Sequence, residues 1–174
     1  MTFIEYIEEL AKRHVDIKHD PVNAIHFLSS ENRKHTSMDS ELCYPAIIID
    51  RGSGLSFSGG PGSYFKDKMF VLFILIHVSD TSDYSEIDKA FEKCEEILCD
   101  ILNKMIEDKH NPELRFLRTF KLEDVEGDYV ENVDYSQYGI MAVLPVSDTY
   151  KPINCSKRFL MDRSFDETFD KTFN

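Results

Sequence analysis

The chain has 174 residues, of which 42% are hydrophobic, and it carries a formal net charge of −12. This length and composition are typical of one globular domain with its own core. The acidic surplus argues against sequence-specific nucleic-acid binding, because affinity for phosphate comes mainly from Lys and Arg. It favours either solubility alone or a channel through which DNA slides without sticking.

The chain shows no membrane or export signal. Its longest apolar run, residues 69–76, is much shorter than the roughly 20 residues that span a bilayer. The N-terminus is acidic and lacks the basic start of a secretory signal. We therefore expect no membrane partner.

Residues 2–15 are predicted to form a helix, because Thr2 and Glu5 fit a capping box before a face of apolar residues at helical spacing. A short strand is expected at residues 24–28. The polar stretch that follows reads as a loop, and residues 45–50 read as a second strand.

The next segment, residues 52–62, contains five of the seven glycines. It predicts a flexible hairpin or surface loop, with a short strand where apolar residues alternate with serines. The segment lacks the GK[ST] and GxGxxG patterns of phosphate-binding loops, so its expected role is contact with a partner. The candidate contact residues are Gly52, Gly54, Leu55, Phe57, Gly59, Gly60 and Gly62.

Residues 66–78 give the strongest strand signal, since they are apolar on both faces and indicate a central strand. Residues 85–109 predict a long helix from apolar positions that step by four and three. Further strands are expected at residues 114–122 and 138–146. The acidic segment around Gly127 between them predicts an exposed hairpin turn, a further candidate for partner contact.

Together these elements predict an α+β fold, with a mainly antiparallel sheet covered by one long amphipathic helix plus an N-terminal helix. This domain is expected to span residues 1–148. Residues 149–174 are expected to form an extended C-terminal arm. Phe165, Phe169 and Phe173 would share one face of a helix there. Such a helix could pack on its own domain or dock on a neighbour, and the sequence leaves both open.

No motif in the chain predicts catalysis, a cofactor or a metal. The four cysteines form no CxxC pair, and the six histidines lack zinc-site spacing. The acids around Gly127 do not match a calcium-binding EF-hand loop. There is no GxSxG nucleophile elbow. We therefore expect no catalytic, cofactor-binding or metal-binding residue, and free thiols in a reducing compartment.

The order of elements resembles the tail-terminator, or tail-completion, proteins of tailed phages and the neck and tail ring proteins of crAss-like short-tailed phages. The resemblance covers residues 1–148 and depends on the apolar strand, the long helix and the closing strand YGIMAVLPV. It implies a structural virion protein, not an enzyme. This protein would assemble in the host cytoplasm as a homo-oligomeric ring around the DNA channel and join other neck or tail proteins.

Two alternatives remain open at the level of sequence. One is a cytoplasmic module that binds a peptide or a small ligand without catalysis. The other is an enzyme of a type that has no short motif, which would need a titrating group with a perturbed pKa in a cleft.

Overall fold

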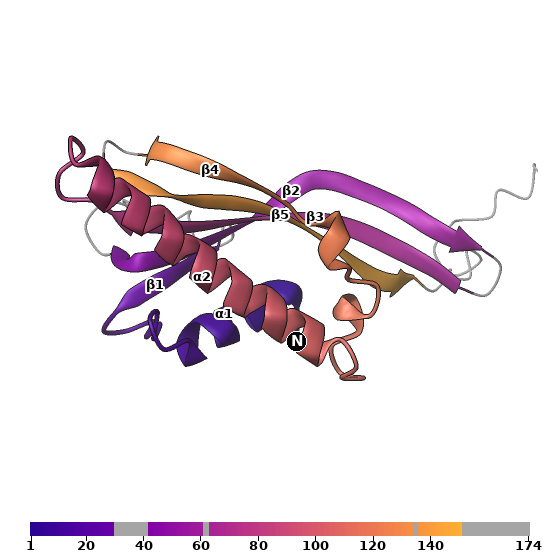
Figure 1. Ribbon diagram of the computed structural model, residues 1–174. Coiled ribbons are helices and arrows are strands. Elements are labelled where there is room, and N and C mark those ends of the chain that lie inside the picture. Colours follow the sequence, from indigo (N-terminus) through magenta and orange to yellow (C-terminus); the bar gives the residue numbers. More distant parts are fainter. Residues whose placement is uncertain (30–41, 61–62, 134–135, 151–174) are drawn as a thin grey trace, which may run out of the picture.

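The computed structural model describes residues 1–29, 42–60, 63–133 and 136–150. In this part of the chain, two helices lie on one face of a five-stranded sheet (Figure 1). The helices are α1 (Phe3–Arg13) and α2 (Tyr84–Asp108), and the strands are β1 (Ile25–Ser29), β2 (Leu42–Gly60), β3 (Ser63–His77), β4 (Glu126–Val133) and β5 (Gln137–Tyr150). The α+β fold expected from the sequence is confirmed.

The strands lie across the sheet in the order β1-β2-β3-β5-β4. The pairs β2–β3, β3–β5 and β4–β5 are antiparallel, whereas β1 and β2 are parallel. A parallel pair needs a connection of about a dozen residues, and residues 30–41 supply that length. The sheet is therefore mixed at one edge and antiparallel in the rest of its described strands.

The central strand β3 is apolar on both faces, as its sequence predicts. Phe70, Leu72 and Ile74 belong to the main core under the helices. On the opposite face, Leu75 is buried and Phe73 is half-buried. Both described helices lie on the first of these faces (Figure 1).

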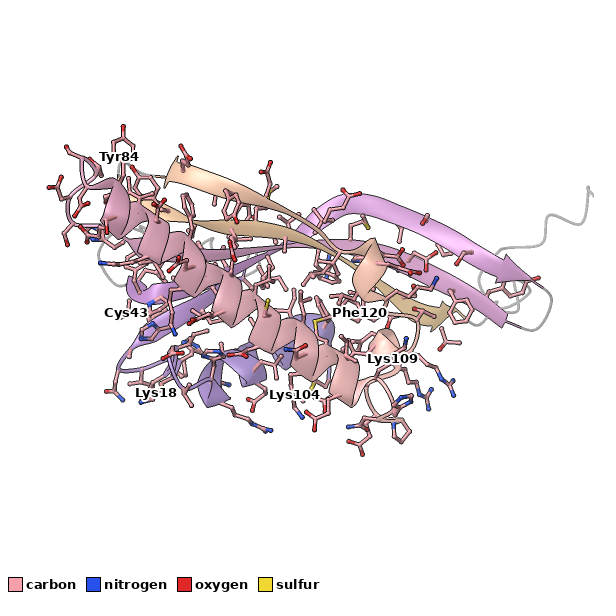
Figure 2. All side chains as sticks on the ribbon, viewed as in Figure 1. Lys18, Cys43, Tyr84, Lys104, Lys109 and Phe120 are labelled. Atoms are coloured by element: carbon pink, nitrogen blue, oxygen red, sulfur yellow. The ribbon has the colours of Figure 1, made fainter. Side chains whose placement is uncertain are left out.

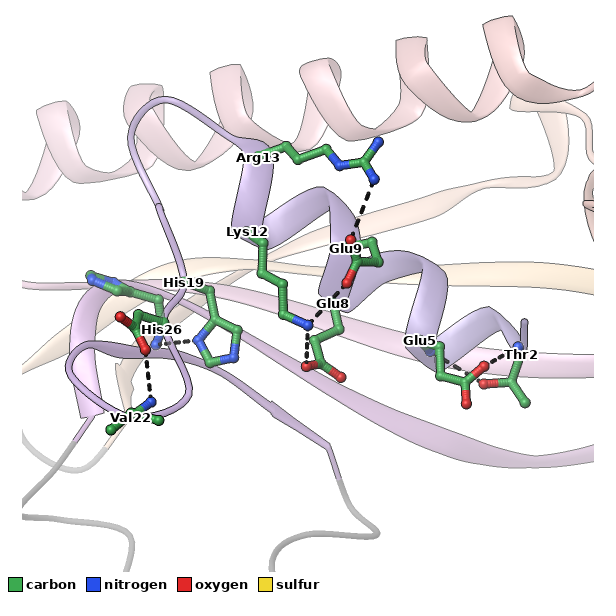
Figure 3. A network of polar contacts seen from close by, with 10 residues as sticks. Thr2, Glu5, Glu8, Glu9, Lys12, Arg13, His19, Val22 and His26 are labelled. Atoms are coloured by element: carbon green, nitrogen blue, oxygen red, sulfur yellow. Dashed lines mark hydrogen bonds and ion pairs between the residues drawn. The ribbon is translucent and has the colours of Figure 1, made fainter.

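The first helix begins where the sequence places it. The backbone N–H of Glu5 donates to Thr2 Oγ1 at 3.2 Å, and the Thr2 N–H donates to Glu5 Oε2 at 2.7 Å, so the capping box is complete. In the last turn, Lys12 pairs with Glu8 and Glu9 (Figure 3). Contacts between residues three or four positions apart therefore stabilise both ends of α1.

The long helix α2 is also close to its predicted bounds. Asp83 is its N-cap and accepts a hydrogen bond from the Ser85 N–H at 2.9 Å. The buried stripe of the helix packs over β3 and β5. It consists of Ile87, Ala90, Cys94, Ile97, Ile101, Leu102 and Met105.

The strand predicted at residues 114–122 is wrong. This segment instead contains the 3₁₀ turns η1 (Arg115–Leu117) and η2 (Leu122–Asp124). Leu114, Phe116, Leu117 and Phe120 are all buried, which is not the alternation of a strand. The ring of Phe116 lies 5.7 Å from the rings of both Phe3 and Tyr6. The segment therefore packs into the core against the first turns of α1.

The acidic hairpin turn predicted around Gly127 is also wrong, because residues 126–133 form strand β4. Gly127 lies opposite Ala142 of β5, in the ladder and not at the tip of a hairpin. Side chains of β4 alternate between the two faces, so Tyr129 joins Ile140 on the helix side of the sheet. The acidic residues kept this strand from being recognised, since strands at the edge of a sheet tolerate charge that central strands do not.

Candidate functional site

The glycine-rich segment belongs to an antiparallel hairpin, one of the two forms expected, and not to a surface loop; the short strand expected within it is part of a long one. All of residues 52–60 belong to β2, which pairs with β3 up to Gly60 and Ser63. Residues 55–60 of β2, 63–68 of β3 and 146–150 of β5 continue the sheet beyond the two helices (Figure 1). We call this three-stranded part the sheet extension.

One face of the sheet extension is apolar and exposed. Leu55 lies opposite Lys68, and Phe57 lies opposite Lys66. Lys68 in turn lies opposite Val146, whose side chain faces the helices. Residues directly opposite in an antiparallel pair share a face, so Leu55 and Phe57 continue the helix-covered face past the helices. Leu55 is 57% exposed and Phe57 is 60% exposed.

The same face carries two lysines. Lys66 and Lys68 lie beside these apolar side chains, and Lys68 forms an ion pair with Asp148 of β5. Tyr64, closer to the tip, is also exposed. The sheet extension therefore combines apolar surface with basic groups, in a protein that is acidic as a whole.

The predicted contact glycines have different surroundings. A Cβ on Gly52 or Gly54 would press against Met69 of the neighbouring strand, at 3.0 Å and 2.8 Å respectively. Gly59 has a φ of 102°, which favours glycine, and a Cβ on Gly60 would meet open space. Gly52 therefore lets β2 approach the backbone of β3 closely, which is a structural role, whereas the neighbour of Gly54 is the Met69 side chain.

The remaining predicted contact residues are not brought together with the sheet extension. Gly127 lies on β4 at the opposite edge of the sheet from β1. Gly62, Phe165, Phe169 and Phe173 lie outside the described residues.

A groove between α2 and β4 was not predicted. It has a volume of about 420 Å³ and is lined by Asp88, Phe91, Glu92, Glu95, Tyr129 and Glu131. We call it the acidic groove. The rings of Phe91 and Tyr129 meet edge to face with centroids 4.9 Å apart. The Tyr129 hydroxyl donates to Glu95, and this bond raises the pKa of Tyr129. Only the pairing of β4 with β5 places Tyr129 beside α2, so sequence gave no signal for this groove.

A second groove separates α1 from the C-terminal half of α2. We call this cavity of about 410 Å³ the interhelical groove. The Tyr6 hydroxyl donates to Asp108 Oδ2 at 3.1 Å, and His14 Nε2 lies 3.3 Å from Asp100 Oδ2. Burial, together with the nearby Asp108 carboxylate, raises the pKa of Tyr6 well above its ordinary value. The phenol therefore stays protonated and joins the two helices.

Cys94 and His19 are further titratable groups that are buried. Cys94 is fully buried, and burial raises the pKa of its thiol to about 12, so it is not a nucleophile. His19 is only 7% exposed, and its Nδ1 accepts a hydrogen bond from the His26 N–H at 3.1 Å. Burial lowers the pKa of His19, which favours the neutral ring.

Across the described ranges, no group of three or more His, Cys, Asp or Glu residues is arranged to hold a metal ion. No helix in those ranges is long and apolar enough to cross a membrane. No protein-family model matches the chain, and no curated protein sequence matches it. The function of the chain is therefore inferred from the sheet extension, the acidic groove and the interhelical groove.

Proposed function

We propose that this protein is a structural component of a phage virion, which forms a ring at the neck or tail around the DNA channel. The layout supports this proposal, because a long helix on a largely antiparallel sheet is the arrangement on which the resemblance to tail-terminator proteins depends. The protein would assemble in the host cytoplasm and remain in the particle.

The sheet extension is the observation that carries the proposal. Leu55, Phe57 and Tyr64 are exposed on one face of strands that project beyond the helices. An exposed apolar patch on a soluble domain is typical of a contact surface. A ring would bury this patch against a neighbour, and no catalytic role needs it.

The charge of the chain fits a protein that surrounds DNA without holding it. Asp and Glu outnumber Lys and Arg by 32 to 20. Acidic walls repel phosphates, so DNA would pass through the lumen instead of binding to it. The C-terminal residues Phe165, Phe169 and Phe173 would add a further contact with a neighbouring subunit or another neck or tail protein.

A binding module is the second candidate, favoured by the interhelical groove. Its volume of about 410 Å³ is in the range of small-ligand sites. Arg13, Lys104 and His14 offer hydrogen-bond donors there, and Glu9, Asp100 and Asp108 offer acceptors. Such a site would suit a small molecule that carries both charges.

Native mass spectrometry of the full-length protein over a concentration series separates these two functions. A closed oligomer without bound small molecule, seen as rings by electron microscopy, supports the virion protein. A monomer or dimer that carries a defined extra mass supports the binding module. Substituting Arg13→Gln and Lys104→Gln should then remove that mass, whereas these changes should leave a ring intact.

A further inference from the structure

The sheet extension and the acidic groove differ in charge and lie toward opposite ends of the molecule. In Figure 2, Tyr84 marks the end of α2 that is far from the tip of β2 and β3. The acidic groove lies between the N-terminal half of α2 and β4 at that far end. One molecule therefore presents two unlike surfaces toward its opposite ends.

The two surfaces are complementary in charge. On the face of the sheet extension that carries Leu55 and Phe57, Lys66 and Lys68 are basic and Asp148 is acidic, so the described part of this face has a surplus of positive charge. Among the described residues, the acidic groove is lined by four carboxylates, from Asp88, Glu92, Glu95 and Glu131, and by no basic side chain. Bringing opposite charges together favours association and fixes its orientation.

The two surfaces also match in their apolar parts. Tyr129 is 55% exposed in the acidic groove and Phe91 is partly buried beneath it. Leu55 and Phe57 on the sheet extension would cover the rings of Phe91 and Tyr129, so that the apolar side chains of both surfaces would be removed from contact with water. Aromatic side chains surrounded by charged ones are typical of the centre and rim of a protein interface.

We propose that copies of this chain join head to tail, with the sheet extension of one copy seated in the acidic groove of the next. A two-fold dimer through either surface would place lysine against lysine, or carboxylate against carboxylate. Like charges in contact oppose that dimer. A contact between two different surfaces of the same chain is heterologous. Such a contact closes into a ring when repeating the rotation between neighbouring copies returns to the first copy. The proposal rests on the proposed function, since it supplies the contact from which that ring would be built.

Charge reversal tests this contact directly. The extension variant carries Lys66→Glu and Lys68→Glu, and the groove variant carries Glu92→Lys and Glu131→Lys. In each variant alone, the changed side chains meet like charges on the next copy. We expect each to need at least about tenfold more protein for half-maximal assembly, by native mass spectrometry. An equimolar mixture of the two should assemble again, since each variant then meets an opposite charge on both of its surfaces.

Two controls keep the test specific. Glu113→Lys with Glu123→Lys makes the same charge change as the groove variant at exposed positions outside both surfaces and should leave assembly unchanged. Leu55→Ser removes apolar contact without touching the Lys68–Asp148 ion pair and should weaken assembly, while thermal unfolding shows that the domain is folded.

The outcomes distinguish this inference from the proposed function. Closed rings that both charge-reversal variants still form would overturn the head-to-tail contact and leave the ring protein standing. Open filaments that the variants abolish, and that the mixture restores, would support the contact but overturn the ring. A wild-type protein that stays monomeric at every concentration would overturn both.

Discussion

Gly139 allows β5 to lie close to the backbone of β3, because glycine has no Cβ. A Cβ at this position would lie 1.9 Å from the carbonyl oxygen of Ile74 and 3.0 Å from Cα of Leu75. Both atoms belong to the backbone of β3, so no side-chain movement could relieve the contact. We expect Gly139→Ala to reduce the free energy of unfolding by about 3 kcal/mol, measured by urea denaturation.

Gly127, on the adjoining strand, is the matched control for that substitution. A Cβ on Gly127 would come no closer than 3.7 Å to the Met141 carbonyl oxygen, an ordinary contact. Gly127→Ala should therefore be neutral or stabilising by about 0.5 kcal/mol, because alanine loses less backbone entropy than glycine on folding. Equal losses in both variants would show that close approach at Gly139 is not the cause.

Burial of His19 should make stability depend on pH near neutrality. Its pKa is lowered in the folded protein from an ordinary value of 6.5, so below about pH 6.5 the unfolded chain binds more protons than the folded one. The free energy of unfolding therefore falls as the pH drops through this window, and is constant above it as far as His19 is concerned.

Urea denaturation at pH 7.5 and pH 5.5 measures this effect. His19→Asn keeps an acceptor for the His26 N–H but cannot be protonated, so it should reduce the loss of stability at the lower pH. The exposed His110 provides the control His110→Asn. A variant at His19 with the same pH dependence as the wild type would exclude His19 as its origin.

At the scale of elements, the bond between Tyr6 and Asp108 joins α1 to α2. The Tyr6 side chain is 3% exposed, and its hydroxyl donates to Asp108 at 3.1 Å. Tyr6→Phe removes this bond while Lys104 still pairs with Asp108 at 3.0 Å. We expect a loss of about 1 kcal/mol in the free energy of unfolding. Tyr129→Phe removes a similar bond to Glu95 at an exposed position and should leave stability unchanged.

Elements with local signals could be predicted, and those set by distant contacts could not. The capping box at Thr2 and the apolar stripe of α2 depend only on nearby residues, so both helices were predicted within two residues at each end. Residues 114–122 contain enough apolar residues for a strand, but the structure has 3₁₀ turns in this segment. There Phe116 packs against Phe3 and Tyr6, which are more than 100 positions away in the chain. Strand β4 is acidic and is recognisable only through its pairing with β5.

At the scale of the whole molecule, the sequence located half of the candidate interface. Leu55 and Phe57 are predicted contact residues, although the glycines and serines around them predict only a short strand in a flexible hairpin or loop and not a long strand. Phe91 and Tyr129 belong to segments 38 positions apart in the chain, and their meeting depends on the order of strands in the sheet. No pattern within either segment predicts that they form one groove.

The C-terminal residues 160–174 provide the last test, because they could serve either the fold or the assembly. Phe165, Phe169 and Phe173 are spaced to share one face of a helix. So short a helix is marginal in water unless it packs against apolar surface. If that surface belongs to a neighbour, deletion of residues 160–174 should leave one cooperative thermal transition and weaken assembly in native mass spectrometry.

The triple variant Phe165→Ser, Phe169→Ser and Phe173→Ser should have the same effect as the deletion, because it removes the apolar face and keeps the length. Glu167→Ser with Lys171→Ser changes the positions that would lie opposite this face on a helix and should assemble normally. A truncated chain that no longer unfolds cooperatively would instead place the three phenylalanines in the core of their own domain. Assembly would then depend on the folded domain alone, in which the sheet extension and the acidic groove are two exposed surfaces that a neighbour could contact.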